Sequence, residues 1–242
     1  MPEIYAFIPA RAGSSRLESK NMRLMHGRPL TEWTVELARK SGLFDRIYVS
    51  TDIDELIEQY KNDQGTVDVI ERPASLSGGD ATLLEVIQHT ALDLGWREDA
   101  LLALLQPTAP LRVTSDLFEA LRLFEAHGGA ATVVSVSQNL YPPALLWERD
   151  GAFLKSMHGS DDPKVTRKQN HADTFLWNDI IALDSVAGWM KEGRNLFGVG
   201  EPVALDIPLE RCMPIDYPVQ FRLAEALFPP VDERTGKKEW EL

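Results

Sequence analysis

Short apolar segments rich in β-branched residues alternate with amphipathic segments along the first half of the chain. The apolar segments have the length and composition of strands that are buried on both faces. Between them, apolar residues recur at three- and four-residue spacing, which is typical of helices packed on a sheet. The pattern predicts strands at 4–9, 46–50, 67–71, 101–105 and 131–136, and helices at about 29–41, 53–63, 82–95 and 115–127. This alternation indicates βαβ units, so we expect an α/β fold with a doubly wound, mostly parallel sheet.

The pattern changes after about residue 138. Tyr141-Pro142-Pro143 interrupts the chain, and the polar stretch from His158 to Asp173 has no clear period, which indicates an inserted arm over about 138–176. Beyond the arm, the pattern predicts strands at 179–183, 196–199 and 203–207, and helices at 185–192 and 217–228. We therefore expect a single domain over residues 1–228 that carries the arm, followed by a charged, peripheral extension over 229–242.

The composition of the chain disfavours some binding partners and some cellular locations. The chain has 242 residues and a formal net charge of −12, which argues against a nucleic-acid partner because such proteins neutralise phosphates with Lys and Arg. The sole cysteine, Cys212, forms no internal disulfide, so nothing calls for an oxidising compartment. The first ten residues lack a secretory signal pattern, and the longest uncharged stretch, 128–147, is too polar to span a bilayer. We expect a cytoplasmic protein without a membrane segment.

The loop after the first predicted strand concentrates groups that bind phosphate. From Arg11 to Arg28 the chain carries five basic residues and one acidic residue, in contrast to its acidic total. Gly13 lets the backbone approach a ligand, successive amides can form an anion-binding nest, and Arg11 and Lys20 can neutralise phosphate oxygens. Open α/β sheets bind ligands at the carboxyl ends of their strands, where this loop begins. The sequence contains neither GxxxxGK[ST] nor GxGxxG here, which disfavours an ordinary P-loop or dinucleotide site.

Four segments carry a resemblance to a known family: Ile8–Asn21, Gly27–Leu30, Val49–Asp52 and Leu104–Arg112. They resemble the acylneuraminate cytidylyltransferases, which activate sialic acid and related nonulosonic acids as CMP-sugars. The related enzymes for eight-carbon 3-deoxy-octulosonate share a similar first loop, but the Lys20-Asn21 pair and the Gln-Pro-Thr-Ala-Pro segment resemble the sialate branch more. The resemblance implies a Rossmann-like nucleotide-diphospho-sugar transferase fold. It also implies a homodimer in which the arm reaches the partner's site.

The resemblance assigns roles in nucleotide binding. Residues that match family positions near CTP are Arg11, Ser14, Lys20, Asn21, Arg72, Asp80 and Thr82, and Gly13 of the same loop is predicted to bind the nucleotide with them. Four of these residues have structural alternatives. Asn21 can instead turn the loop, Arg72 can pair with Glu71, and Asp80 or Thr82 can cap the following helix.

For the acceptor sugar, the resemblance implies roles for Gln106, Arg167 and Asn178. Arg167 would meet the sugar carboxylate, because a bidentate guanidinium suits that group. The alternatives are that Gln106 satisfies loop backbone groups and that Arg167 belongs to an exposed basic patch. Arg112 is predicted to fix the loop, and His158 and His171 are predicted to be surface residues without a metal.

The closing motif, Ile207–Pro218, departs from the family pattern. The family usually carries two aspartates one residue apart near Mg²⁺; this chain has Asp216 but Pro214 at the first position. Mg²⁺ takes one or two protein carboxylates, so Asp216 can serve as the metal ligand, although it can also cap a helix. A second departure is Asn178-Asp179-Ile180, where the family more often has Asn-Gly-Ala.

These observations predict a Mg²⁺-dependent cytidylyltransferase that transfers CMP from CTP to the anomeric hydroxyl of a nonulosonic acid and releases pyrophosphate. Such a reaction depends on positioning and charge stabilisation, for which Arg11, Lys20 and Asp216 are the candidate catalytic residues. No protein general base is indicated. The alternatives are an eight-carbon octulosonate as the acceptor, and a non-catalytic nucleotide-binding relative.

Overall fold

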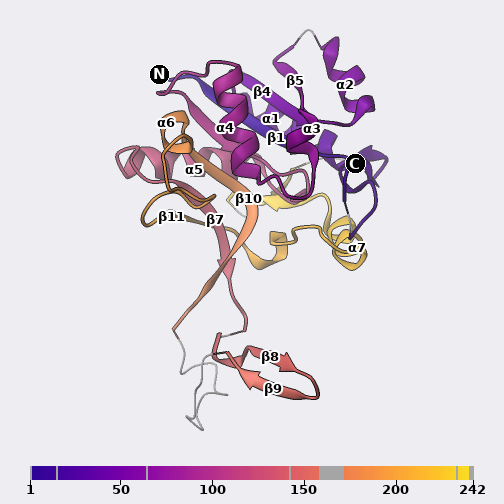
Figure 1. The fold of residues 1–242 in the computed structure, drawn as a ribbon, viewed down its shortest axis with the longest axis vertical. Helices are drawn as coiled ribbons and strands as arrows, with labels where there is room; N and C mark the ends of the chain where they lie inside the picture. Colours follow the sequence, from indigo (N-terminus) through magenta and orange to yellow (C-terminus); the bar gives the residue numbers. More distant parts are fainter. Residues whose placement is uncertain are drawn as a thin grey trace.

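A seven-stranded sheet forms the centre of the computed structural model, which describes residues 2–14, 16–63, 65–141, 143–157, 172–232 and 234–239 (Figure 1). The strand order is β11-β7-β10-β6-β1-β4-β5. β10 runs antiparallel to both of its neighbours, and the other pairings are parallel. The strands are β1 (Ile4–Ala10), β4 (Arg46–Thr51), β5 (Val67–Glu71), β6 (Leu101–Leu104), β7 (Val133–Gln138), β10 (Phe175–Ser185) and β11 (Val203–Asp206).

Helices cover both faces of this sheet, because each central strand sends alternate side chains to opposite sides. In β1, Ala6, Ile8 and Ala10 join an apolar cluster with α1, α2 and α5, while Tyr5 and Phe7 join a second cluster with α4 and α6. The helices are α1 (Leu30–Ser41), α2 (Asp54–Lys61), α3 (Ala74–Ser77), α4 (Leu83–Asp93), α5 (Thr114–Ala126), α6 (Val186–Trp189) and α7 (Pro218–Leu227). The predicted α/β, doubly wound class is confirmed.

The topology brings two loops together. β1 lies between β4 and β6. After β1 the chain adds β4 and β5 on one side of it, and then crosses to the other side of β1 to form β6. Loops diverge at such a switch point and leave a crevice at the carboxyl ends of the strands. The loop that follows β1 and the loop that follows β6 therefore flank the same crevice.

The structure corrects two predicted elements in the second half of the chain. The helix predicted at 185–192 is shorter, because α6 ends at Trp189. The strand predicted at 196–199 is a single bridge between Asn195 and Gly198. Gly198 has a φ of +100°, and a Cβ there would lie 2.2 Å from Thr132 Oγ1, so the backbone turns where the apolar pattern predicted extension.

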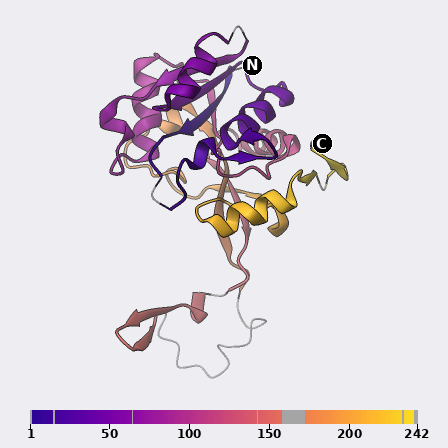
Figure 2. The ribbon, with the colours of Figure 1, turned by 90° about the vertical axis from the view of Figure 1, so that its right-hand side faces the viewer.

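β10 is longer than predicted and carries the arm. It begins at Phe175 rather than near residue 179, and its first residues pair with the end of β7 outside the central sheet. Beyond this ribbon stands a hairpin of β8 (Trp147–Asp150) and β9 (Phe153–Ser156), separated from the body of the molecule (Figures 1 and 2). Residues 158–171, which include His158, Arg167 and His171, lie outside the described residues.

The segment after Pro229 packs on the body rather than lying at its periphery. It contains the short strands β12 (Val231–Asp232) and β13 (Lys237–Lys238). The buried Glu239 carboxylate accepts a hydrogen bond from Thr114 N at 2.8 Å and pairs with Lys40 Nζ at 2.8 Å. These contacts attach the segment to α1 and to the start of α5.

Candidate functional site

Two adjoining cavities, of about 280 and 180 Å³, lie at the carboxyl ends of β1 and β6. Both are lined by Arg11, Lys20 and Asn21, so they form two parts of one site. The larger part is completed by Pro9, Arg72, Gly79, Ala81, Leu83, Val86, Gln106, Pro107 and Thr108. The smaller part is completed by Gly13, Ser14, Arg16 and Asp216.

Hydrogen bonds hold the loop after β1 in place. Ala12 N donates to Asp52 Oδ1 at 2.7 Å, and Asn21 Nδ2 donates to the Arg11 carbonyl at 2.9 Å. Asn21 is buried and thus has the loop-shaping role that the sequence left open, although it also lines both cavities. A Cβ at Gly13 would meet no atom within 4 Å, so this glycine leaves open space along the wall of the smaller cavity.

Two guanidinium groups lie close together at the larger cavity. Arg72 Nη2 donates to the Ser50 carbonyl at 3.0 Å, and Arg11 Nη1 donates to the Gly78 carbonyl at 3.0 Å. Burial lowers the pKa of Arg72, the charge of Asp52 raises it, and the charge of Arg11 lowers it. The alternative partner Glu71 pairs instead with Lys61 at 3.5 Å. Two neighbouring arginines beside a cavity are suited to binding phosphate oxygens.

Asp216 faces the smaller cavity and does not cap α7. The cap is formed by Gln220 Oε1, which accepts hydrogen bonds from Asp216 N and Tyr217 N, both at 2.8 Å. The Asp216 carboxylate instead pairs with Lys20 Nζ at 2.9 Å and with Arg16 Nη1 at 3.4 Å. The Asp216 side chain is 45% exposed, so the carboxylate is accessible to a ligand that enters this cavity.

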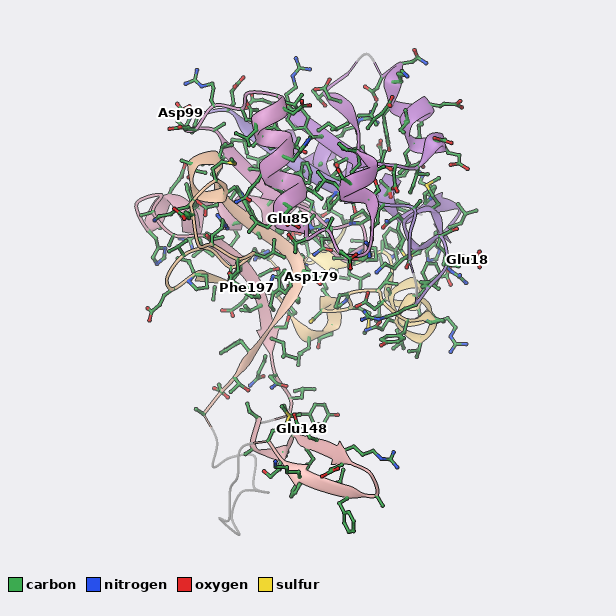
Figure 3. The ribbon with its side chains drawn as sticks, in the orientation of Figure 1. Glu18, Glu85, Asp99, Glu148, Asp179 and Phe197 are labelled. Atoms are coloured by element: carbon green, nitrogen blue, oxygen red, sulfur yellow. The ribbon has the colours of Figure 1, made fainter. Side chains whose placement is uncertain are left out.

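Asp80 and Thr82 are exposed and line neither part of the site, whereas their neighbours Gly79 and Ala81 line the larger cavity. Thr82 caps α4: its Oγ1 accepts from Glu85 N at 3.2 Å, and Glu85 Oε2 accepts from Thr82 N at 2.7 Å. The structure thus favours the capping alternative for Thr82. Figure 3 labels Glu85 at the end of α4 that lies nearer to Asp179.

The three residues assigned to the sugar side have different positions. Gln106 lines the larger cavity. Asn178 is only 1% exposed, lines neither cavity and donates to Ser137 Oγ at 2.8 Å, so its side chain stabilises the β7–β10 pairing. Arg167 is among the residues that are not described. Arg112 is buried and donates to the carbonyls of Ile180 and Gln106, which agrees with its predicted structural role.

Asp179 lines neither cavity, but residues that line them act on its carboxyl group, and the sequence pattern did not assign it a role. Burial raises the pKa of its carboxyl group to about 6; the charge of Asp216 raises this pKa further, while Lys20 and the side chain of Gln106 lower it. Its Oδ1 atom is buried without a hydrogen-bond partner. Figure 3 shows Asp179 where β10 leaves the body of the molecule. The available signal was an aspartate at a position where the resembling family more often has glycine.

The profile of one family, described as cytidylyltransferase, matches residues 5–152, which span β1 to β8 and most of the residues that line the site. The chain belongs to the cytidylyltransferase family. This finding confirms the resemblance that the motifs predicted.

Three relatives are similar to this chain, each over a different share of its own length. The N-acylneuraminate cytidylyltransferase of Escherichia coli O18:K1:H7 is 32% identical over 68% of this chain and 38% of its own length. That of Streptococcus agalactiae serotype V is 31% identical over 76% of this chain and 44% of its own length. The chain thus matches less than half the length of these two relatives. A CMP-N,N'-diacetyllegionaminic acid synthase of Legionella pneumophila is 35% identical over 93% of this chain and 95% of its own length.

Solved structures show the same fold at low identity. A CMP:2-keto-3-deoxy-manno-octonic acid synthetase complexed with CTP superposes with a TM-score of 0.66 at 14% identity, covering 93% of this chain and 98% of the other. A 4-diphosphocytidyl-2C-methyl-D-erythritol synthase gives 0.64 at 13% identity, covering 94% and 99%. Within the described ranges, no helix combines the length and apolarity needed to cross a membrane.

Proposed function

We propose that this cytidylyltransferase transfers CMP from CTP to the anomeric hydroxyl of a nonulosonic acid and releases pyrophosphate. The observation that carries the proposal is the two-part site after β1, in which Arg11, Lys20 and Arg72 present positive charge in an otherwise acidic protein. Membership in the cytidylyltransferase family supports CTP as the source of this phosphate-rich ligand.

The residues of the site support catalysis by positioning and charge stabilisation. Arg11 and Arg72 are placed to bind phosphate oxygens as negative charge develops on the leaving pyrophosphate. The open space beside Gly13 admits phosphates close to the loop backbone, where amide groups donate. Pro9, Leu83 and Val86 give the larger cavity an apolar wall that suits the face of a pyrimidine.

The carboxylate of Asp216 fits a divalent cation. It is accessible in the smaller cavity, and a carboxylate oxygen is a ligand of the kind that Mg²⁺ binds. Among the described residues, no three His, Cys, Asp or Glu side chains form a metal-binding group, so substrate phosphates and water would complete the coordination. Bound Mg²⁺ would supply charge neutralisation at the triphosphate. Lys20 and Arg16, which pair with Asp216, would lie beside the phosphates and add positive charge there.

A nine-carbon acceptor is favoured by the relatives. The match to the Legionella pneumophila CMP-N,N'-diacetyllegionaminic acid synthase extends over 93% of this chain. A 3-deoxy-manno-octulosonate cytidylyltransferase of Hydrogenovibrio crunogenus is 36% identical but matches only 44% of the chain. The eight-carbon acceptor therefore stands as the second candidate.

Pyrophosphate release tests the proposal directly. The purified protein is supplied with CTP, Mg²⁺ and one sugar acid at a time: N-acetylneuraminate, N,N'-diacetyllegionaminate or 3-deoxy-manno-octulosonate. We expect turnover with a nine-carbon acid, and none when ATP replaces CTP. Turnover with the octulosonate alone would select the second candidate, and CTP binding without turnover on any acid would make the chain a non-catalytic relative.

We also propose that the arm contacts a second copy of the chain. Large apolar side chains are exposed along it: Leu140, Tyr141, Trp147, Phe153, Leu154, Met157, Phe175 and Leu176. Large apolar side chains gathered on one exposed element often mark a surface that binds a partner. Figure 2 shows that the hairpin stands clear of the body, where a second protomer has access to it.

A further inference from the structure

A buried ion pair outside the two cavities joins separate parts of the chain next to the site. Asp116 lies in the first turn of α5, and Arg211 lies in the closing motif (Ile207–Pro218); both are buried. Arg211 Nη1 and Nη2 donate to the two carboxylate oxygens of Asp116 at 2.6 and 3.0 Å. Nη1 also donates to the Leu111 carbonyl at 3.3 Å. Arg211 thus attaches the closing motif to α5 and to the loop that follows β6.

The carboxylate of Asp116 also accepts hydrogen bonds from two other parts of the chain. Val113 N donates to it at 3.0 Å, which satisfies an amide that the start of α5 leaves without a helical partner. Arg234 Nη1, from the segment after Pro229, donates to Oδ1 at 3.0 Å. A buried carboxylate is costly unless it is paired and hydrogen-bonded, so these donors fix one another's positions around it.

The closing motif and the loop after β6 meet at the site. Ile215 N donates to the Thr108 carbonyl at 2.8 Å. Thr108 lines the larger cavity, and Asp216, which follows Ile215, lines the smaller one. The loop after β6 has a separate support, because Arg112 donates to the Gln106 carbonyl at 3.2 Å. A change at Arg211 is therefore expected to displace the closing motif more than this loop.

We propose that Arg211 is a positioning residue for the cytidylyl transfer, because its bonds to Asp116 hold the closing motif where the Asp216 carboxylate faces the smaller cavity. Arg211 lines neither cavity, so it acts through the backbone and not on the substrates. Misplacing a group of the site by about 1 Å can lower the rate by about 100-fold. The inference rests on the proposed function, because it concerns the rate of that reaction.

The variant Arg211→Lys tests this role. Lysine keeps a positive charge beside Asp116 but cannot form two parallel hydrogen bonds with its carboxylate. With the sugar acid that the wild type uses, we expect kcat for pyrophosphate release to fall by about 10-fold or more. KM for CTP should stay within about 3-fold of the wild type, because Arg11 and Arg72 are held by other contacts. A residue that only stabilises the fold would leave kcat unchanged well below the unfolding temperature.

The matched control is a second buried arginine–aspartate pair at the opposite edge of the sheet. Arg194 Nη1 pairs with Asp184 at 3.0 Å, and Asp184 lies opposite Leu102 near the start of β6. Neither member of the pair lines a cavity of the site. Arg194→Lys is expected to lower the thermal stability and to leave kcat and KM unchanged. A fall in kcat that is equal in Arg194→Lys and Arg211→Lys would overturn the inference.

A milder variant covers the case in which Arg211→Lys does not fold. Arg234→Gln removes one donor from Asp116 and keeps Arg211 in place, and the Arg234 side chain is 38% exposed. We expect a smaller fall in kcat than the one expected for Arg211→Lys, again without a change in KM for CTP. If Arg211→Lys does not fold, a wild-type kcat in Arg234→Gln overturns the inference.

Hydrogen exchange measures the attachment of the closing motif without catalysis. A peptide over residues 207–217 should exchange faster in Arg211→Lys than in the wild type, because the amide of Ile215 loses its partner more often. Arg194→Lys should leave this peptide unchanged. If the wild type releases pyrophosphate and Arg211→Lys keeps its kcat, the inference fails and the function stands. If no acid is turned over, the proposed reaction fails; faster exchange confined to this peptide then supports the attachment, and unchanged exchange overturns it.

Discussion

At the scale of single residues, Asp179 destabilises the metal-free fold. Its folded pKa of about 6 lies above the ordinary value of 3.8, so the folded protein binds more protons than the unfolded chain between these values. The free energy of unfolding therefore decreases as the pH rises from about 4 to about 6, and the loss persists above pH 6. An ionisable residue that costs stability at a part-buried position is consistent with a placement that serves function rather than stability.

Replacing this carboxyl group by an amide is expected to stabilise the metal-free protein. Asp179→Asn removes the ionisation penalty and should raise the free energy of unfolding by about 1–3 kcal/mol at pH 8. The gain should shrink toward pH 5, where the carboxyl group of the wild type is largely protonated. Urea unfolding in EDTA at both pH values measures it, with Asp93→Asn as the matched control. A gain that is equal at pH 5 and pH 8 would show that ionisation of Asp179 is not its source.

At the scale of helices and strands, Thr82 has a structural role that can be separated from nucleotide binding. Its hydroxyl both accepts from Glu85 N and donates to Glu85 Oε2, so it is engaged at the start of α4. Thr82→Ala is expected to lower the free energy of unfolding by about 1 kcal/mol. Because Thr82 lines neither cavity, the KM for CTP should stay the same.

Thr82→Ser provides the matched variant, because serine keeps the capping hydroxyl. It should retain most of the stability, as judged by urea unfolding, and the wild-type KM. A several-fold increase in KM for CTP in Thr82→Ala that Thr82→Ser reverses would instead assign this hydroxyl to the nucleotide.

How well an element could be predicted depends on whether the residues that determine it are close together in the sequence. β1, β4, β5 and β6 were predicted to within one residue at each end, because each is a short run rich in apolar or β-branched residues and this signal is local. The start of β10 was missed because Phe175 and Leu176 are exposed on a ribbon outside the sheet. The loop cations were identifiable from local composition. The role of Asp179 was not, because its environment is formed by Gln106, Asp216 and a register shift that are distant in sequence.

At the scale of the whole molecule, an acidic total coexists with a cationic site because several basic residues are concentrated at one crevice. The net charge of −12 is an average over the chain, whereas Arg11, Lys20 and Arg72 line one crevice. A small polyanion responds to the local field of such a crevice, whereas a long nucleic acid would also meet the carboxylates that give the chain its net negative charge. The overall charge thus constrains the size of the anion that the protein can bind.

The arm determines the expected assembly. Phe153 and Leu154, which are 80% and 65% exposed at the hairpin, are the side chains that gain most from contact with a second copy. We expect a dimer at micromolar concentration in light scattering coupled to size-exclusion chromatography, and a monomer for Phe153→Asp combined with Leu154→Asp. The control variant Phe118→Asp changes a side chain that is 49% exposed on α5 of the body, and this variant should remain a dimer. Because the hairpin is separated from the core, the double variant should keep the thermal stability of a folded monomer. A wild-type monomer, or a double variant that remains a dimer, would show that the arm does not join two copies.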